Sequence, residues 1–140
     1  MRVSELCWLE WSQIDFASSL LHVVRLKGSI STTHPLRGIE LRALRRLKRE
    51  QEPSRHIWIT ERGAPMTAGG FRQMLRRTGS ESDLGFPVHP HMLRHACGFA
   101  LANRGHDTRA LQAYLGHRNI QHTVRYTELA PTRFKDFWRV

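Results

Sequence analysis

The sequence after Pro90 limits the possible folds most, because three consecutive segments there show helical patterns with clear ends. Apolar residues at helical spacing predict helices over 92–103, 108–115 and 120–129. Asp107 is a suitable N-cap for the second of these helices, and Gly116 can end it in the left-handed conformation. A chain with three short linked helices in its last third is expected to be mainly helical.

The preceding sequence predicts a small antiparallel sheet between further helices. The elements expected there are a helix at 2–10, strands at 14–16, 20–24 and 30–32, a helix at 36–50, a strand at 56–60, a helix at 68–78 and a loop at 79–87. The helix at 36–50 has leucines on one face and arginines on the other, and Thr67 can cap the helix that follows it. The expected fold class is α+β, mainly α-helical, with a small antiparallel β-sheet near the N-terminus.

Composition favours a single basic domain that binds nucleic acid. The 140 residues are 40% apolar, and 22 Lys and Arg against 12 Asp and Glu give a net charge of +10. Of the 22 cations 19 are Arg, whose planar fork binds phosphate in a bidentate manner. No apolar run approaches the ~20 residues of a membrane span, and no signal peptide opens the chain. Cys7 and Cys97 are too few for a disulfide scaffold, so a reducing, cytoplasmic location is expected.

Four side chains between His89 and Tyr126 suit the handling of a phosphate group. His91 and Arg94 are three residues apart, so on a helix they share a face and can hold two oxygens of one phosphate. His117 follows a glycine that lets the imidazole point away from its helix. Tyr126 is a poor nucleophile alone, with a phenol pKa of about 10, and needs nearby cations to attack phosphorus.

Five short motifs in this order resemble the catalytic domain of the tyrosine recombinases, the phage-integrase family. The motifs are Arg2-Val-Ser-Glu-Leu6, Lys27-Gly28, His91-Met-Leu-Arg-His95, Leu115-Gly-His117 and Tyr126. Within that family, the segments 31–36 and 89–103 look like the small enzymes that invert fimbrial promoter segments.

The resemblance implies an enzyme that cuts and rejoins DNA through a 3′-phosphotyrosine. The catalytic residues that it implies are Arg2, Lys27, His91, Arg94, His117 and Tyr126. Tyr126 would be the nucleophile and Lys27 the general acid for the leaving 5′-oxygen, while Glu5 would orient neighbouring groups. No metal ion or other cofactor is expected. The implied partner is double-stranded DNA with inverted-repeat sites, bound by four protomers that are monomers or weak oligomers when free, with no membrane involved.

The resemblance also implies that residues 1–140 are one catalytic domain that begins late. Relatives have helices before the first Arg and a separate DNA-clamping domain before those, whereas Met1 directly precedes Arg2 here. An absent N-terminal core-binding domain is therefore expected. The aromatic residues of the tail are expected to anchor on a neighbouring protomer: Phe134, Phe137 and Trp138.

Three other functions stay open from the sequence. A type IB topoisomerase uses similar chemistry but relaxes one duplex without exchanging strands. A non-catalytic DNA-binding fragment would keep the fold and bind DNA with a steep salt dependence. A zinc-dependent nuclease is suggested by His91 and His95 at spacing i, i+4, with His89 nearby, although no glutamate follows His91 and Arg94 would repel the metal. His95 is expected to pack or to hydrogen-bond rather than to act in catalysis.

Overall fold

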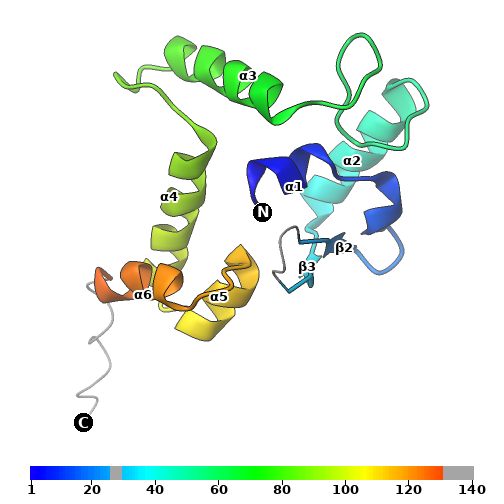
Figure 1. Cartoon of the computed structure of the whole chain (residues 1–140). Coiled ribbons are helices and arrows are strands. Elements are labelled where there is room, and N and C mark those ends of the chain that lie inside the picture. The colour runs from blue at the N-terminus through cyan, green and yellow to red at the C-terminus, as the bar shows by residue number, and fades with distance from the viewer. Residues whose placement is uncertain (26–29, 131–140) are drawn as a thin grey trace.

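The structure, a computed structural model, describes residues 1–25 and 30–130. Its elements in chain order are α1 (Val3–Cys7), the 3-10 turn η1 (Trp11–Gln13), β1 (Ile14–Asp15), β2 (Leu20–Val23), β3 (Thr32–Pro35), α2 (Gly38–Glu50), α3 (Ala68–Glu81), α4 (Pro90–Asn103), α5 (Thr108–Leu115) and α6 (Gln121–Glu128). Figure 1 shows α1, the sheet and α2 gathered on one side and α4, α5 and α6 on the other, with α3 at the top of the view. The predicted class, mainly helical with a small antiparallel sheet, is confirmed.

The three strands of the described residues form one antiparallel sheet in the order β1-β2-β3. Between β2 and β3, Leu20 lies opposite Pro35 and Val23 lies opposite Thr32. β3 therefore begins two residues later than predicted and extends to Pro35. An edge strand tolerates this proline, because a missing N–H matters little where no further strand pairs.

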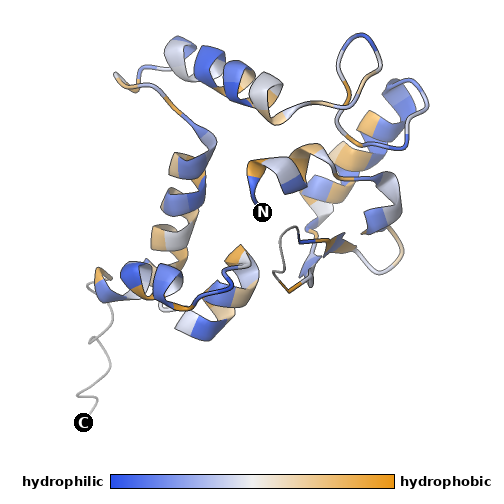
Figure 2. Cartoon of the chain, viewed as in Figure 1, coloured by the Kyte–Doolittle hydropathy of each residue, from blue (hydrophilic) through white to orange (hydrophobic). Residues whose placement is uncertain are grey.

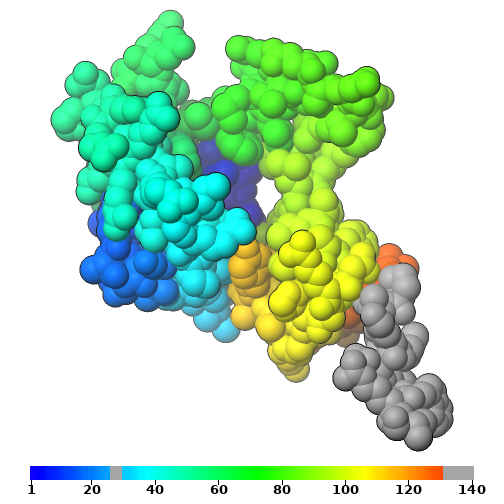
Figure 3. Space-filling view, turned by 180° about the vertical axis from the view of Figure 1, so that it is seen from behind, coloured from blue at the N-terminus to red at the C-terminus, as the bar shows by residue number. Residues whose placement is uncertain are grey.

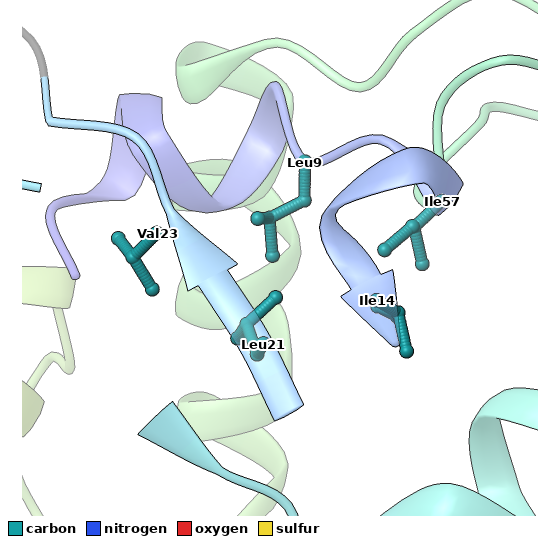
Figure 4. Packing of buried hydrophobic residues seen from close by; sticks show 5 residues of the cluster. All are labelled: Leu9, Ile14, Leu21, Val23 and Ile57. Atoms are coloured by element: carbon teal, nitrogen blue, oxygen red, sulfur yellow. The ribbon is translucent and has the colours of Figure 1, made fainter. Parts of the chain in front are cut away.

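A first hydrophobic core lies beside this sheet (Figure 4). Its buried members are Leu9, Ile14, Leu21, Val23 and Ile57. Leu21 and Val23 reach the same face because side chains alternate along a strand. Leu44 and Leu47 of α2 pack against the cluster from outside. The predicted amphipathic helix therefore buries its leucine side against the sheet.

α2 carries arginines and Lys48 between its leucines, and Figure 2 shows hydrophilic and hydrophobic residues side by side along this helix. The helix begins two residues later than predicted, where the Arg37 N–H donates to Glu40 Oε2 at 2.7 Å and so satisfies one end group. The ammonium of Lys48 lies 5.5 Å from the ring centroids of Trp11 and Phe16. Part of the basic face therefore takes part in packing within the chain.

The strand predicted at 56–60 is wrong, although this segment is a core element. It contains two isolated bridges, from Glu10 to His56 and from Ile59 to Pro65. Ile57, which is 1% exposed, donates its N–H to the connection after α1 at 2.9 Å. Because neighbouring residues pair with different segments, no continuous ladder forms and the chain only passes through the core.

α3 starts as predicted and ends later than predicted. Thr67 Oγ1 accepts the Gly70 N–H at 3.0 Å, which confirms the N-cap. The loop expected from 79 is wrong at its start, because the helix continues through Gly79 to Glu81. A Cβ at Gly79 would lie 2.9 Å from Val88 Cγ2, so glycine here allows the returning chain to pack against the helix.

The last three helices surround a second core, whose buried members are Ala102, Leu111, Leu115, Tyr126 and Ala130. Asp107 caps α5 as predicted, since its carboxylate accepts the N–H groups of Arg109 and Ala110 at 3.0 and 2.8 Å. Gly116 ends α5 with φ +68°, the left-handed conformation predicted for it. α4 starts at Pro90, two residues earlier than predicted, because proline suits the first helical position.

A cavity of about 800 Å³ lies between the two groups of elements. Its lining is mostly apolar, with Leu6 of α1, Val23 of β2, Phe71 of α3 and Leu93 of α4. Figure 3 shows a hollow on the back face, with the start of the chain visible deep between the α2 and α4 sides.

Within residues 1–25 and 30–130, every helix is too short or too polar to cross a membrane.

Candidate active site

Arg94, in the first half of α4, has a buried guanidinium nitrogen without an acceptor. Its Nη2 donates to the Leu115 carbonyl, whereas its Nη1 is buried and has no hydrogen-bond partner in the described part of the chain. Burial lowers the pKa of Arg94, and the positive charges of Arg2 and Arg25 lower it further. Such a buried N–H group costs free energy until an anion accepts a hydrogen bond from it, so this position is suited to binding an oxyanion.

Glu5 is the buried carboxylate that organises the guanidinium groups. It accepts the Arg2 N–H at 2.7 Å and the Arg25 Nη1 at 2.9 Å, and Arg2 Nη1 lies 3.4 Å away. Burial alone would raise the pKa of Glu5, but the bonds from Arg2 and Arg25 lower it overall. These contacts fit the orienting role expected for Glu5. One carboxylate among three arginines leaves a net positive charge at the site.

Arg25 is a site residue that the sequence reasoning missed. Its side chain is fully buried, and besides Glu5 it donates from Nη2 to the Tyr114 carbonyl at 2.9 Å. It thereby joins α1 to the C-terminal end of α5. A signal existed in the sequence, because Arg25 continues the inward alternation of Leu21 and Val23. A charge at an inward position of a strand needs a buried partner.

His117 lies directly after Gly116, which turns the chain away from α5. Its Nδ1 lies 2.7 Å from the hydroxyl of Thr123, which is fully buried. Burial lowers the pKa of His117 to about 4, and the charges of Arg94 and His122 add to the effect. The ring is therefore neutral at neutral pH. When the threonine hydroxyl donates to Nδ1, the ring carries its proton on Nε2 and can donate a hydrogen bond from there to a phosphate oxygen.

The ring of Tyr126 is held tightly from several sides. The residue is 4% exposed, with Phe99 packed edge-on at a centroid distance of 4.9 Å and His117 stacked at 6.2 Å. A Cβ at Gly98 would lie 2.8 Å from Tyr126 Cε2. Glycine at this point of α4 therefore allows the phenol ring to lie against the helix backbone.

The hydroxyl of Tyr126 is hydrogen-bonded to His95, with Oη 2.6 Å from Nδ1. This hydrogen bond agrees with the expectation that His95 packs or hydrogen-bonds within the fold. Burial raises the pKa of Tyr126, and the charges of Arg94 and Arg125 oppose that rise. The phenol is therefore protonated at neutral pH and must lose its proton when it attacks.

The remaining predicted residues lie at the edge of this cluster or outside the described part. His91 is exposed, and its ring lies 5.7 Å from that of His95, one helical turn further on. Lys27 lies outside the described residues, as do the three aromatic residues of the tail. Among the described residues, no group of three or more His, Cys, Asp or Glu is placed to hold a metal ion. The zinc interpretation therefore has no ligand set in that part of the chain.

The described site combines an anion-binding cluster with a tyrosine hydroxyl. Arg2 and Arg94 are near enough to lower the pKa of His117, and Arg94 also acts on the phenol of Tyr126. The sequence separates Arg2 from Tyr126 by nearly the whole described chain, yet the fold brings both to Arg94 and His117. Guanidinium and imidazole N–H groups beside a phenol are suited to phosphoryl transfer onto tyrosine.

The chain belongs to the phage integrase family, the tyrosine recombinases, since a model of that family matches residues 1–133. It is 43% identical over 142 residues to the type 1 fimbriae regulatory protein FimB of Escherichia coli K12. That alignment covers 98% of this chain and 71% of FimB. It is 42% identical over 144 residues to FimE of the same strain, covering 99% of this chain and 73% of FimE. The resemblance to this family and to fimbrial recombinases is thereby confirmed.

Solved structures share the fold over nearly the whole chain. The XerA recombinase superposes with a TM-score of 0.79 at 25% identity, over 97% of this chain and 51% of XerA. The Tn1549 transposon integrase, solved in complex with transposon right end DNA, gives a TM-score of 0.76 at 26% identity over 90% of this chain. The chain spans about half the length of these solved relatives.

Proposed function

We propose that this chain cuts and rejoins DNA by attack of Tyr126 on a phosphodiester, leaving a 3′-phosphotyrosine and a free 5′-hydroxyl. The observation that carries the proposal is the buried Nη1 of Arg94, which lacks an acceptor in the described structure and lies in a positive cluster near the phenol. A scissile phosphate would supply that acceptor. Because the bond energy is kept in the phosphotyrosine, rejoining needs no external energy source.

The proposed roles follow the charges of the site. Arg2, Arg94 and His117 donate to the non-bridging oxygens as charge grows on them, and His91 assists from the edge. Loss of one such donor typically lowers the rate by about 10²–10³. Lys27 is proposed as the general acid that protonates the leaving 5′-oxygen, which would otherwise depart as a high-energy alkoxide.

The proposed substrate is double-stranded DNA with inverted repeats that flank a fimbrial promoter segment, in the cytoplasm. The likeness to FimB and FimE supports this choice. The charge of +10 supports a DNA partner. Exchange of strands between two sites would use four protomers, two on each site.

The test is trapping of the covalent intermediate on a nicked suicide substrate that carries the inverted repeat. The nick releases a short fragment after cleavage, so the 5′-hydroxyl is lost and the adduct accumulates. We expect a denaturation-resistant adduct with the wild-type chain and none with Tyr126→Phe. Tyr114→Phe is the matched control, because Tyr114 is the other of the two tyrosines and is 48% exposed. An adduct that persists in Tyr126→Phe would refute the assignment of the nucleophile.

The alternative functions give different results in the same experiments. A non-catalytic fragment would bind DNA with a steep salt dependence and form no adduct. A topoisomerase would relax supercoiled plasmids that lack the inverted repeat over many turnovers, which a site-specific recombinase would not do.

A further inference from the structure

His95 presents an imidazole nitrogen directly to the hydroxyl of Tyr126. The distance from Nδ1 to Oη is 2.6 Å, short for a hydrogen bond between a neutral hydroxyl and a ring nitrogen. The two rings are tilted by 58° with their centroids 5.8 Å apart, so they meet through the polar atoms and do not stack.

The geometry of this contact is set by rigid elements on both sides. His95 lies on α4 one turn before Phe99, which packs edge-on against Tyr126. Gly98, also on α4, lets the phenol ring lie against the helix. The imidazole therefore belongs to the same helix as Gly98 and Phe99, which also contact the phenol ring.

The other two histidines near Tyr126 are less suited to take its proton. The ring of His117 is nearly parallel to the phenol ring, at 24°, and its Nδ1 is bound to the hydroxyl of Thr123. It therefore presents its face to Tyr126. His91 lies one turn before His95, and the ring that it stacks on is that of His95, at 5.7 Å.

The charges around the pair set both groups in the protonation states needed. Burial lowers the pKa of His95 most. The charges of His91 and Arg94 on α4, and of His89 just before it, lower this pKa further. From the α5–α6 connection His117 faces the same ring, and it is neutral because its own pKa is about 4. At neutral pH the imidazole is thus free to accept a proton while the phenol still holds one.

We propose that His95 is the proton acceptor for Tyr126, a role that rests on the proposed function of Tyr126 as nucleophile. As the bond from Tyr126 Oη to phosphorus forms, the phenolic proton moves to His95 Nδ1 and the ring becomes an imidazolium. The bond from phosphorus to the 5′-oxygen breaks, and that oxygen takes a proton from the general acid, proposed as Lys27. In rejoining, the imidazolium returns its proton to the departing tyrosine.

The kinetic test uses single-turnover cleavage of a suicide substrate whose scissile 5′-oxygen is replaced by sulfur. A thiolate leaves without a general acid, so the rate reports on activation of the nucleophile. We expect His95→Gln to lower this rate by about a hundredfold, the low end for general base catalysis. The matched control is His106→Gln, because His106 is an exposed histidine in the loop after α4.

The pH dependence separates a proton acceptor from a residue that only supports the ring. The wild-type rate should rise with pH and reach a plateau once His95 is neutral. His95→Gln should lose that plateau, because the phenol must then give its proton to solvent base. A His95→Gln variant that cleaves within a factor of two of wild type, with an unchanged pH profile, overturns the proposal.

A measurement without DNA keeps the two proposals distinguishable. In ¹⁵N spectra, we expect the His95 ring to carry its proton on Nε2 and the Nδ1 signal to shift in Tyr126→Phe. A ring protonated on Nδ1 would be the donor in the contact and would overturn the role of His95 even in an active enzyme. Failure of the wild-type chain to form an adduct would instead defeat the proposed function, with the ring tautomer still decided by the spectra.

Discussion

Substitution of Gly116 by alanine should destabilise the chain through two separate effects. Gly116 has φ +68° and ψ +40°, a left-handed conformation that an L-residue adopts at a cost of about 1–2 kcal/mol. The added Cβ would also lie 2.5 Å from Arg25 Cζ and 2.6 Å from its Nε. The first effect is local, and the second depends on whether Arg25 can move.

Arg25 has little freedom to move. Its side chain is fully buried, with Nη1 2.9 Å from Glu5 Oε2 and Nη2 2.9 Å from the Tyr114 carbonyl. Relief of the clash would lengthen at least one of these contacts, and a hydrogen bond to a charged group contributes about 1.5–3 kcal/mol. The two effects together predict a loss of about 2.5–5 kcal/mol in the free energy of unfolding for Gly116→Ala.

The assay is urea unfolding of Gly116→Ala beside Gly105→Ala. Gly105 has φ +83°, and a Cβ there would meet nothing within 4 Å, so this control includes only the backbone effect. We expect Gly105→Ala to lose about 1–2 kcal/mol and Gly116→Ala to lose about 1.5–3 kcal/mol more, with equal denaturant dependence. Equal losses in the two variants would refute the conclusion that Arg25 is held rigidly.

Three further predictions concern the site. Gly98→Ala should lower adduct formation by about a hundredfold, because its Cβ would displace the Tyr126 ring, whereas Gly69→Ala, whose nearest contact is 3.9 Å, should keep wild-type cleavage. His117 binds its proton only below about pH 4 in the folded chain but near 6.5 when unfolded, so stability should fall as the pH drops from 6.5 toward 4. In His117→Gln the loss of unfolding free energy between pH 7 and 5 should be smaller, and an equal loss would contradict this account. Sulfate should raise the melting temperature of the wild type more than that of Arg94→Lys at equal ionic strength. The guanidinium can hold the backbone carbonyl with one nitrogen and the anion with another, whereas all N–H donors of lysine lie on a single nitrogen. An equal rise would argue against an anion at this position.

Local signals in the sequence were enough for most of the helices. Asp107 and Thr67 were recognised as caps because a side-chain oxygen at that position satisfies the first free N–H groups, whatever lies around the helix. Gly116 was predicted to be left-handed for an equally local reason. The strand expected at 56–60 failed because apolar residues in a short run fit any buried segment, and only the partners decide whether a ladder forms.

The motifs also indicated which side chains belong together at the site, but not how they meet. The motifs that contain Arg2, Arg94, His117 and Tyr126 predict phosphoryl transfer through the family that they resemble. Arg25 was overlooked, since its meaning depends on Glu5 and on the end of α5, which are distant in sequence. These contacts depend on how distant segments pack together, and a local sequence pattern carries no information about such packing.

The sequence by itself determined the helix ends at Thr67, Asp107 and Gly116, the basic charge and the chemical character of the site, because caps, glycine conformations and side-chain types act within a few residues. The tertiary structure alone decided that Gly98 makes room for Tyr126, that His95 meets its hydroxyl, and that Arg94 keeps a buried nitrogen without an acceptor. Each of these depends on distances of a few ångströms between different helices. Such distances follow from how two hydrophobic cores pack, and packing is a property of the whole fold.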